Sequence, residues 1–258
     1  MLVSMLEINI KTLSEIEDRY YFTPIKEEFE EKISEAGEKY ALNYLTKVMQ
    51  AATSKVERLI QARIRDGIIS SADQARKTIA GNGFQGLVAY SLIKLQEKKL
   101  LNPDLAITLK PKKHQLIEKY AAIKVGDDIQ KPDIDLLIYH YSRPEKYPVI
   151  IYSIKTSLRE RAGQTYRWKL LMDIVSSNDC KTIKDKYSLT YKAIDNFKVG
   201  FITTNFYNEI TNPQQKGMLK FFDFVYITKH GKWEMPVCEF SKIVDDLNGI
   251  YNIAAKAF

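Results

Sequence analysis

Two apolar runs separated by six mostly polar residues constrain the fold of this chain more than any other feature. Residues 136–141 are Leu-Leu-Ile-Tyr-His-Tyr and residues 148–154 are Pro-Val-Ile-Ile-Tyr-Ser-Ile, with the β-branched and aromatic bias of buried strands. The six residues between them include Pro144 and several polar side chains, which favours a short antiparallel connection. The pattern therefore predicts a β-hairpin with buried strands.

Acidic residues and a lysine lie at the open end of this hairpin. Asp133 and Asp135 precede the first strand, and Lys155 ends the second. The two arms are similar in length and side chains alternate along a strand, so these residues should meet, with Ser153 and Lys155 on one face. The competing interpretation is a half-buried hairpin with solvated acids at its mouth.

This combination suits phosphodiester hydrolysis. Mg²⁺ prefers oxygen ligands and keeps several waters, so one or two carboxylates and a substrate phosphate are enough to hold it. A lysine beside the metal could orient or deprotonate the attacking water and offset charge on the phosphate.

The residues Arg159, Glu160 and Arg161 follow the lysine closely. Arginine binds guanine O6 and N7 bidentately and a carboxylate accepts from cytosine N4, so this triplet could recognise G·C pairs in the major groove. A solvated charged face is the alternative. Gln164, Arg167 and Lys169 continue the polar stretch and are further candidates for DNA contact.

The pattern Lys155-Thr-Ser-Leu-Arg159-Glu160-Arg161 resembles type II restriction endonucleases of the PD-(D/E)xK superfamily, in particular the Lys-x-x-x-Arg-Glu-Arg subgroup. The resemblance implies an α/β fold with an αβββαβ core, a mixed sheet flanked by helices. It also implies Mg²⁺-dependent cleavage of both strands of double-stranded DNA at a short G·C-containing palindrome, a homodimer, and the Arg-Glu-Arg triplet as base readers.

The resemblance extends upstream to residues 76–85, which are similar to the first core helix of the superfamily. The family often has a supporting Glu there, and this chain has Gln85. We therefore expect a helical region at residues 1–75, where amphipathic helices fit residues 11–66, and a catalytic core at residues 76–258. Within the core, the pattern predicts a helix over residues 165–176, a loop with some helix over 187–197, a strand over 221–228 and a C-terminal helix over 240–258.

The second metal-binding acid is the main departure from the family. It usually stands two residues before the lysine, where this chain has Ser153. Asp173 in the next helix and Asp133 are both candidates to replace it. The principal ligand is Asp133 or Asp135, and Asp135 is favoured because it immediately precedes the strand. The carbonyl of Ile154 could complete the metal shell.

Composition narrows the class further. The net charge of +7 suits a polyanionic partner such as DNA. No apolar run is long enough to span a membrane and Glu7 interrupts the N-terminal apolar residues, so we expect an intracellular protein. The family resemblance implies that this is the cytoplasm of a prokaryotic cell. The two cysteines and three histidines show no zinc-ligand spacing.

Gly81–Gly86 match the G-x-G-x-x-G pattern without a preceding strand, so no nucleotide cofactor is expected. Two alternatives to a restriction enzyme stay open. One is a nuclease of the same core that acts in DNA repair or recombination. The other is a catalytically inactive DNA-binding domain, in which Ser153 and Gln85 would stand where the acidic residues of an active site have been lost.

Overall fold

A mixed six-stranded sheet lies at the centre of the computed structural model, which describes residues 5–191, 197–206 and 208–251, without the side chains of residues 5, 6 and 159–162. Its strand order is β1-β4-β5-β7-β8-β9. The strands are β1 (Leu105–Leu109), β4 (Leu136–His140), β5 (Val149–Lys155), β7 (Phe197–Thr203), β8 (Phe224–Ile227) and β9 (Val237–Glu239). The first three are antiparallel and the last four run parallel, so β5 belongs to both halves.

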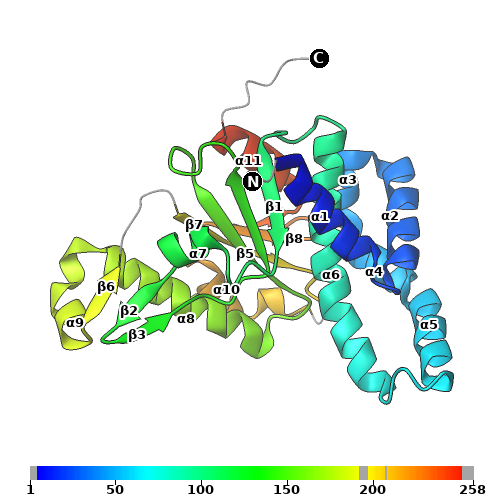
Figure 1. Cartoon of the computed structure of the whole chain (residues 1–258), viewed down its shortest axis with the longest axis horizontal. Helices are drawn as coiled ribbons and strands as arrows, with labels where there is room; N and C mark the ends of the chain where they lie inside the picture. The colour runs from blue at the N-terminus through cyan, green and yellow to red at the C-terminus, as the bar shows by residue number, and fades with distance from the viewer. Residues whose placement is uncertain (1–4, 192–196, 207, 252–258) are drawn as a thin grey trace.

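Helices cover both faces of this sheet (Figure 1). On one face lie α1 (Met5–Glu17), α2 (Phe22–Ala36), α4 (Leu45–Ala51), α5 (Thr53–Arg65), α6 (Ala72–Glu97) and α11 (Lys242–Ile250). On the other lie α7 (Gln115–Tyr120), α8 (Arg159–Ser176) and α10 (Pro213–Leu219). The short elements α3 (Glu38–Ala41), η1 (Leu42–Tyr44) and η3 (Glu209–Thr211) connect larger ones. The result is the expected three-layer α/β architecture with an N-terminal helical region.

The predicted hairpin is confirmed. Strands β4 and β5 pair antiparallel, with Leu136 opposite Tyr152. The Asp135 amide extends the ladder by donating to the Tyr152 carbonyl at 3.1 Å. Ile150 and Ile154 pack toward the N-terminal helices and Ile151 packs toward α8, as strand alternation requires. The start of β4 and the end of β5 therefore lie at one edge of the sheet.

Helix α6 is the element that joins the N-terminal helices to the sheet. It starts at a Ser71 cap, whose hydroxyl accepts from the Gln74 amide at 3.3 Å. Gly81–Gly86 lie inside this helix. A Cβ added at Gly83 would come within 3.1 Å of Ile25, so glycine permits close approach of α2. In the described part of the chain, no helix combines the length and the apolar character needed to cross a membrane.

Some predicted boundaries were wrong. Helix α8 begins at Arg159, six residues before the start expected at Thr165. A strand expected from residue 221 begins at Phe224. The C-terminal helix expected over residues 240–258 is α11, and residues 252–258 lie outside the described residues.

A second, three-stranded sheet was not predicted. It consists of β2 (Ile123–Val125), β3 (Asp128–Gln130) and β6 (Leu189–Tyr191), in the order β3-β2-β6. It lies on the opposite side of the main sheet from the N-terminal helices, next to α9 (Lys181–Lys186), with η2 (Asn178–Cys180) just before that helix (Figure 1). Three-residue strands are too short to display alternation, so β6 was expected to be loop.

Candidate active site

The open end of the β4–β5 hairpin gathers two carboxylates around one ammonium group. The Lys155 Nζ lies 2.7 Å from Asp135 Oδ2 and 3.1 Å from Asp133 Oδ2. The lysine ends β5, and its place is fixed by parallel pairing with Thr203 of β7. The acids come from the segment that enters β4, so the hairpin register brings all three residues together.

Asp135 lies at the centre of this group. Its Oδ2 accepts from Lys155 Nζ and from the Ile154 amide, both at 2.7 Å, and its Oδ1 accepts from Gln85 Nε2 at 2.7 Å. The residue is only 6% exposed. Three donors therefore hold one carboxylate in a fixed orientation at the edge of the sheet.

Burial sets the protonation behaviour of Asp135. Removal from water penalises the charged form and raises the pKa of this carboxyl above its usual value. The Lys155 ammonium and the Ile154 amide oppose that rise, and burial has the larger effect. A carboxylate that is costly to keep charged gains from additional positive charge, such as a divalent cation.

Asp133 occupies the rim of the same group. Its side chain is 36% exposed, against 9% for that of Asp135. Besides Lys155 it faces Lys112 Nζ at 3.9 Å, a cation that sequence reasoning missed. Asp133 is therefore the more accessible of the two acids, and Asp135 the more rigidly held.

Gln85 brings an amide from α6 to the cluster. Its Nε2 is used on Asp135, whereas its Oε1 is buried and has no hydrogen-bond partner among the described residues. A buried oxygen without a donor is costly unless something else binds it, such as a water or a cation.

The donor set fits a hard divalent cation such as Mg²⁺. It comprises the carboxylates of Asp133 and Asp135 and the amide oxygen of Gln85, which are all oxygen ligands. The peptide of Ile154 lies next to them. No cluster of three or more His, Cys, Asp or Glu suited to a metal occurs in the described part. A softer, nitrogen- or sulfur-bound metal has no matching ligands here.

The Ser153 position faces α8 instead of the acids. Its Oγ accepts from Thr165 Oγ1 at 3.0 Å, and both side chains are 1% exposed. A hydroxyl pair thus fills the place where the superfamily usually has its second acid. Thr165 was not predicted from the sequence because no motif marks this residue. Only its position along α8 brings its hydroxyl to Ser153.

The structure does not bring Asp173 to this site, which corrects its candidacy as the displaced acid. Asp173 binds Lys169 at 2.6 Å, and Lys169 also faces Asp223 at 3.9 Å. Asp223 in turn accepts from the amide of Val199, near the start of β7 and far from its Lys155 end. Because α8 begins early, Asp173 lies eight residues beyond Thr165, roughly 12 Å along the helix axis.

The expected base readers begin α8. The helix starts at Arg159, four residues after Lys155, and the side chains of Arg159, Glu160 and Arg161 lie outside the described residues. Gln164 and Arg167 are exposed on the same helix. Lys169 is less accessible to DNA than these two residues, because its side chain is only 12% exposed and is paired with Asp173 and Asp223.

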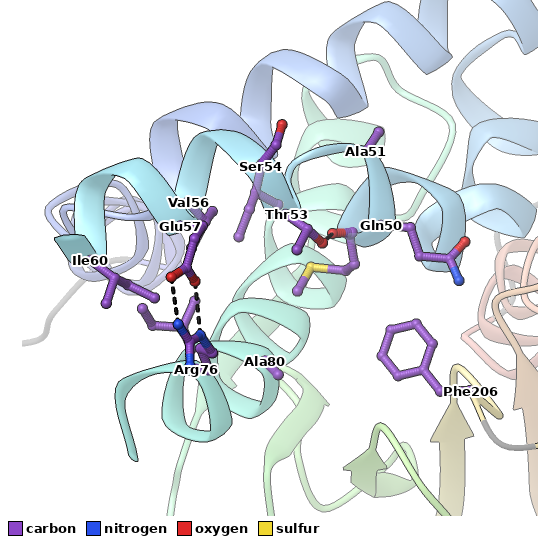
Figure 2. A pocket seen from close by; sticks show the side chains of 13 residues that line it. Gln50, Ala51, Thr53, Ser54, Val56, Glu57, Ile60, Arg76, Ala80 and Phe206 are labelled. Carbon is purple, nitrogen blue, oxygen red and sulfur yellow. Dashed lines mark hydrogen bonds and ion pairs between the residues drawn. The ribbon is translucent and has the colours of Figure 1, made fainter. Parts of the chain in front are cut away.

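An apolar cavity of about 620 Å³ lies between α4, α5 and α6, with Phe206 at one side (Figure 2). The only charged residues in its described lining are Glu57 and Arg76, which bind one another at 2.6 Å. Because these charges neutralise each other, the cavity offers no group for acid–base or metal chemistry. The residues at the sheet edge are therefore the better candidates for a reactive site.

Comparison with known proteins agrees with this fold. Residues 112–249 match the family model described as BsaWI restriction endonuclease type 2, which is more than half of the chain. This match assigns the chain to the type II restriction endonucleases as a class of protein. Within that class, the chain belongs to the BsaWI restriction endonuclease family. The match includes the acids, Lys155 and the start of α8, but not Gln85.

A relative from Methanocaldococcus jannaschii carries the description "Putative type II restriction enzyme MjaVIP". It is 27% identical over 140 residues, which is 50% of this chain and 62% of that protein. The chain thus spans somewhat under two thirds of the curated relative that it matches.

Proposed function

We propose that this protein is a type II restriction endonuclease that hydrolyses phosphodiester bonds in both strands of a short, G·C-containing palindrome. The observation that carries the proposal is the pair of contacts from Lys155 Nζ to Asp135 and Asp133, made at the edge of the sheet immediately before α8. Membership of the BsaWI family supports the restriction activity.

Asp135 and Asp133, with the Gln85 amide oxygen and the Ile154 carbonyl, would hold Mg²⁺. When bound, this ion would supply Lewis-acid stabilisation of the charge that develops on the phosphate. The buried Gln85 Oε1 is the strongest structural support, because it lacks a donor among the described residues.

Lys155 has its own part in the reaction. An ammonium group has three donors, and two of them are used on the carboxylates. The third can bind a phosphate oxygen or orient the attacking water. Since Asp135, Asp133 and the β5–β7 pairing hold Lys155, little reorganisation is needed when DNA binds.

Recognition would use the first turn of α8. Arg159, Glu160 and Arg161 stand next to the catalytic strand in the chain, so base contacts in the major groove would be coupled to the position of the scissile phosphate. A homodimer would present two such turns to the two halves of a palindrome. Gln164 and Arg167 are exposed along the same helix and could add phosphate contacts.

Digestion of a mixed-sequence plasmid tests this function. With Mg²⁺ we expect discrete bands, and sequencing of their ends should reveal one palindromic site. A smear or nicking would indicate a less specific nuclease of the same fold. No cleavage in any divalent cation would indicate a DNA-binding domain without activity. Chelation should abolish the bands, and residence in the prokaryotic cytoplasm would place the enzyme with its DNA substrate.

A further inference from the structure

The connection from β5, the proposed catalytic strand, to α8, the proposed recognition helix, is only three residues long. Hydrogen bonds from other segments of the chain hold it in place. Lys155 ends β5 and α8 starts at Arg159. The carbonyl of Thr156, the first linking residue, accepts from Thr204 Oγ1 at 2.8 Å and from the Phe206 amide at 3.4 Å. Both donors follow β7, the strand that pairs with β5.

The last linking residue is held by a carboxylate. Leu158 is the N-cap residue of α8, and its side chain cannot cap a helix. Its amide donates to Glu209 Oε2 at 2.9 Å. The Leu158 side chain is 0% exposed, so without Glu209 a donor would be left at a largely buried position. A carboxylate here also suits the positive end of the helix dipole.

The described residues next to Glu209 form hydrogen bonds with one another and with the end of β7. The Asn205 amide donates to Thr203 Oγ1 at 3.0 Å, and Asn205 Oδ1 accepts from the Ile210 amide at 3.1 Å. Asn208 lies in the left-handed region at φ 54° and donates to the Asn205 carbonyl at 3.1 Å. Residue 207, between them, lies outside the described residues. Hydrogen bonds of Asn205, Asn208 and Ile210 therefore hold the described backbone on both sides of Glu209.

The catalytic lysine does not depend on these contacts. Lys155 is fixed by its pairing with Thr203 and by its bonds to Asp135 and Asp133. Loss of the Glu209 carboxylate would therefore loosen the start of α8 while the acid–lysine cluster stays in place.

We propose that Glu209 is a positioning residue for sequence recognition: by binding the Leu158 amide, it fixes the first turn of α8 relative to the catalytic strand. It controls discrimination between DNA sites more than the rate of bond cleavage. This inference rests on the proposed function, because it assigns Glu209 to the recognition step of that same site.

The test is cleavage of a random-sequence duplex library with Mg²⁺, with sequencing of the cut ends, followed by single-turnover rates on the preferred site and on sites with one altered base pair. Glu209→Ala should reduce the ratio of these rates on the order of tenfold, with a smaller fall in the rate at the preferred site. Glu209→Gln keeps an acceptor oxygen and should retain most of the discrimination. Glu234→Ala removes another acid, paired with Lys216, and serves as the matched control.

Different failures have different meanings. If the wild-type protein gives no sequence motif, the proposed function falls and this inference with it. If the wild type gives a motif and Glu209→Ala keeps full discrimination, or loses rate and discrimination equally, only the role of Glu209 is overturned. If Glu209→Ala does not fold, Thr204→Val removes the companion tie to Thr156 and must show the same selective loss.

Discussion

Two acid–cation contacts at different depths in the molecule use similar side chains with different consequences. Glu57 and Arg76 join α5 to α6 at the protein surface, where Arg76 lowers the pKa of Glu57 to about 2. Asp135 and Lys155 meet at a buried sheet edge, where burial raises the pKa of Asp135 despite the lysine. The exposed pair neutralises its own charges, whereas beside the buried pair the Gln85 Oε1 has no hydrogen-bond partner among the described residues. A buried ion pair next to such an oxygen, more than ion pairing alone, distinguishes the candidate site.

The strongest test of this comparison is to remove the buried charges. Lys155→Ala or Asp135→Asn should lower single-turnover DNA cleavage at least on the order of 10³-fold, because each removes a preorganised group that acts on the developing charge. DNA binding, measured by gel shift, should persist. Glu57→Ala should cut at close to the wild-type rate. Comparable loss in the Glu57 variant would reverse the comparison.

The second test concerns the unbonded oxygen. Gln85→Ala should reduce cleavage roughly 10- to 100-fold, as is typical when a group that supports a metal ligand is removed. Gln85→Glu should bind Mg²⁺ more tightly, which can be measured as a metal-dependent rise in melting temperature. Gln215 lies in α10, and its buried Oε1 also lacks a partner within the described part of the chain, so Gln215→Ala is the matched control. Equal effects at both glutamines would contradict a metal role for Gln85.

The third test separates recognition from catalysis. Arg161→Ala should cost about 1–3 kcal/mol of discrimination at one base pair if this arginine contacts a base edge. The measurement is the ratio of cleavage rates on the preferred site and on single-base variants. Weaker binding to all DNA by the same factor would identify a phosphate contact instead.

The fourth test uses pH without metal. Between the ordinary Asp pKa of about 3.9 and the raised native pKa of Asp135, the folded state binds more protons than the unfolded state. The free energy of unfolding contributed by Asp135 should therefore fall as pH rises through this window. Denaturant unfolding of wild type and Asp135→Asn isolates the contribution as a difference. A difference that grows with pH would show a native pKa below the ordinary value.

The smallest effect is expected at the exposed pair. Glu57→Gln should change the free energy of unfolding only slightly at neutral pH, since exposed ion pairs contribute little and are screened by salt. Thermal unfolding at low and high salt measures this. A large, salt-independent loss would mean that the pair supports the cavity wall between α5 and α6.

The sequence predicts the site where the determinants are local. The β4–β5 hairpin is specified by strand composition and a short turn, which also fixes the meeting of Asp135 and Lys155. The family resemblance pointed to Gln85, fifty residues before Asp135, which no local pattern could link to it. Asp173 lies with Lys169, away from the acids, because α8 begins six residues earlier than the sequence predicts. Glu209 carries no motif, and its contact with Leu158 depends on how β7 and its following turn pack against β5.

Helix α6 has one more implication. Its residues contact α1, α2, α4 and α5 on one side and β1 and β5 on the other, and Phe84, Leu87 and Tyr90 are completely enclosed. The N-terminal helices thus bury one side of α6, the helix from which Gln85 reaches Asp135. If only the segment after residue 75 were grafted onto another protein, the apolar side of α6 that packs against these helices would be exposed to water. A chimaera built to transfer the proposed nuclease activity therefore has to include the N-terminal helices.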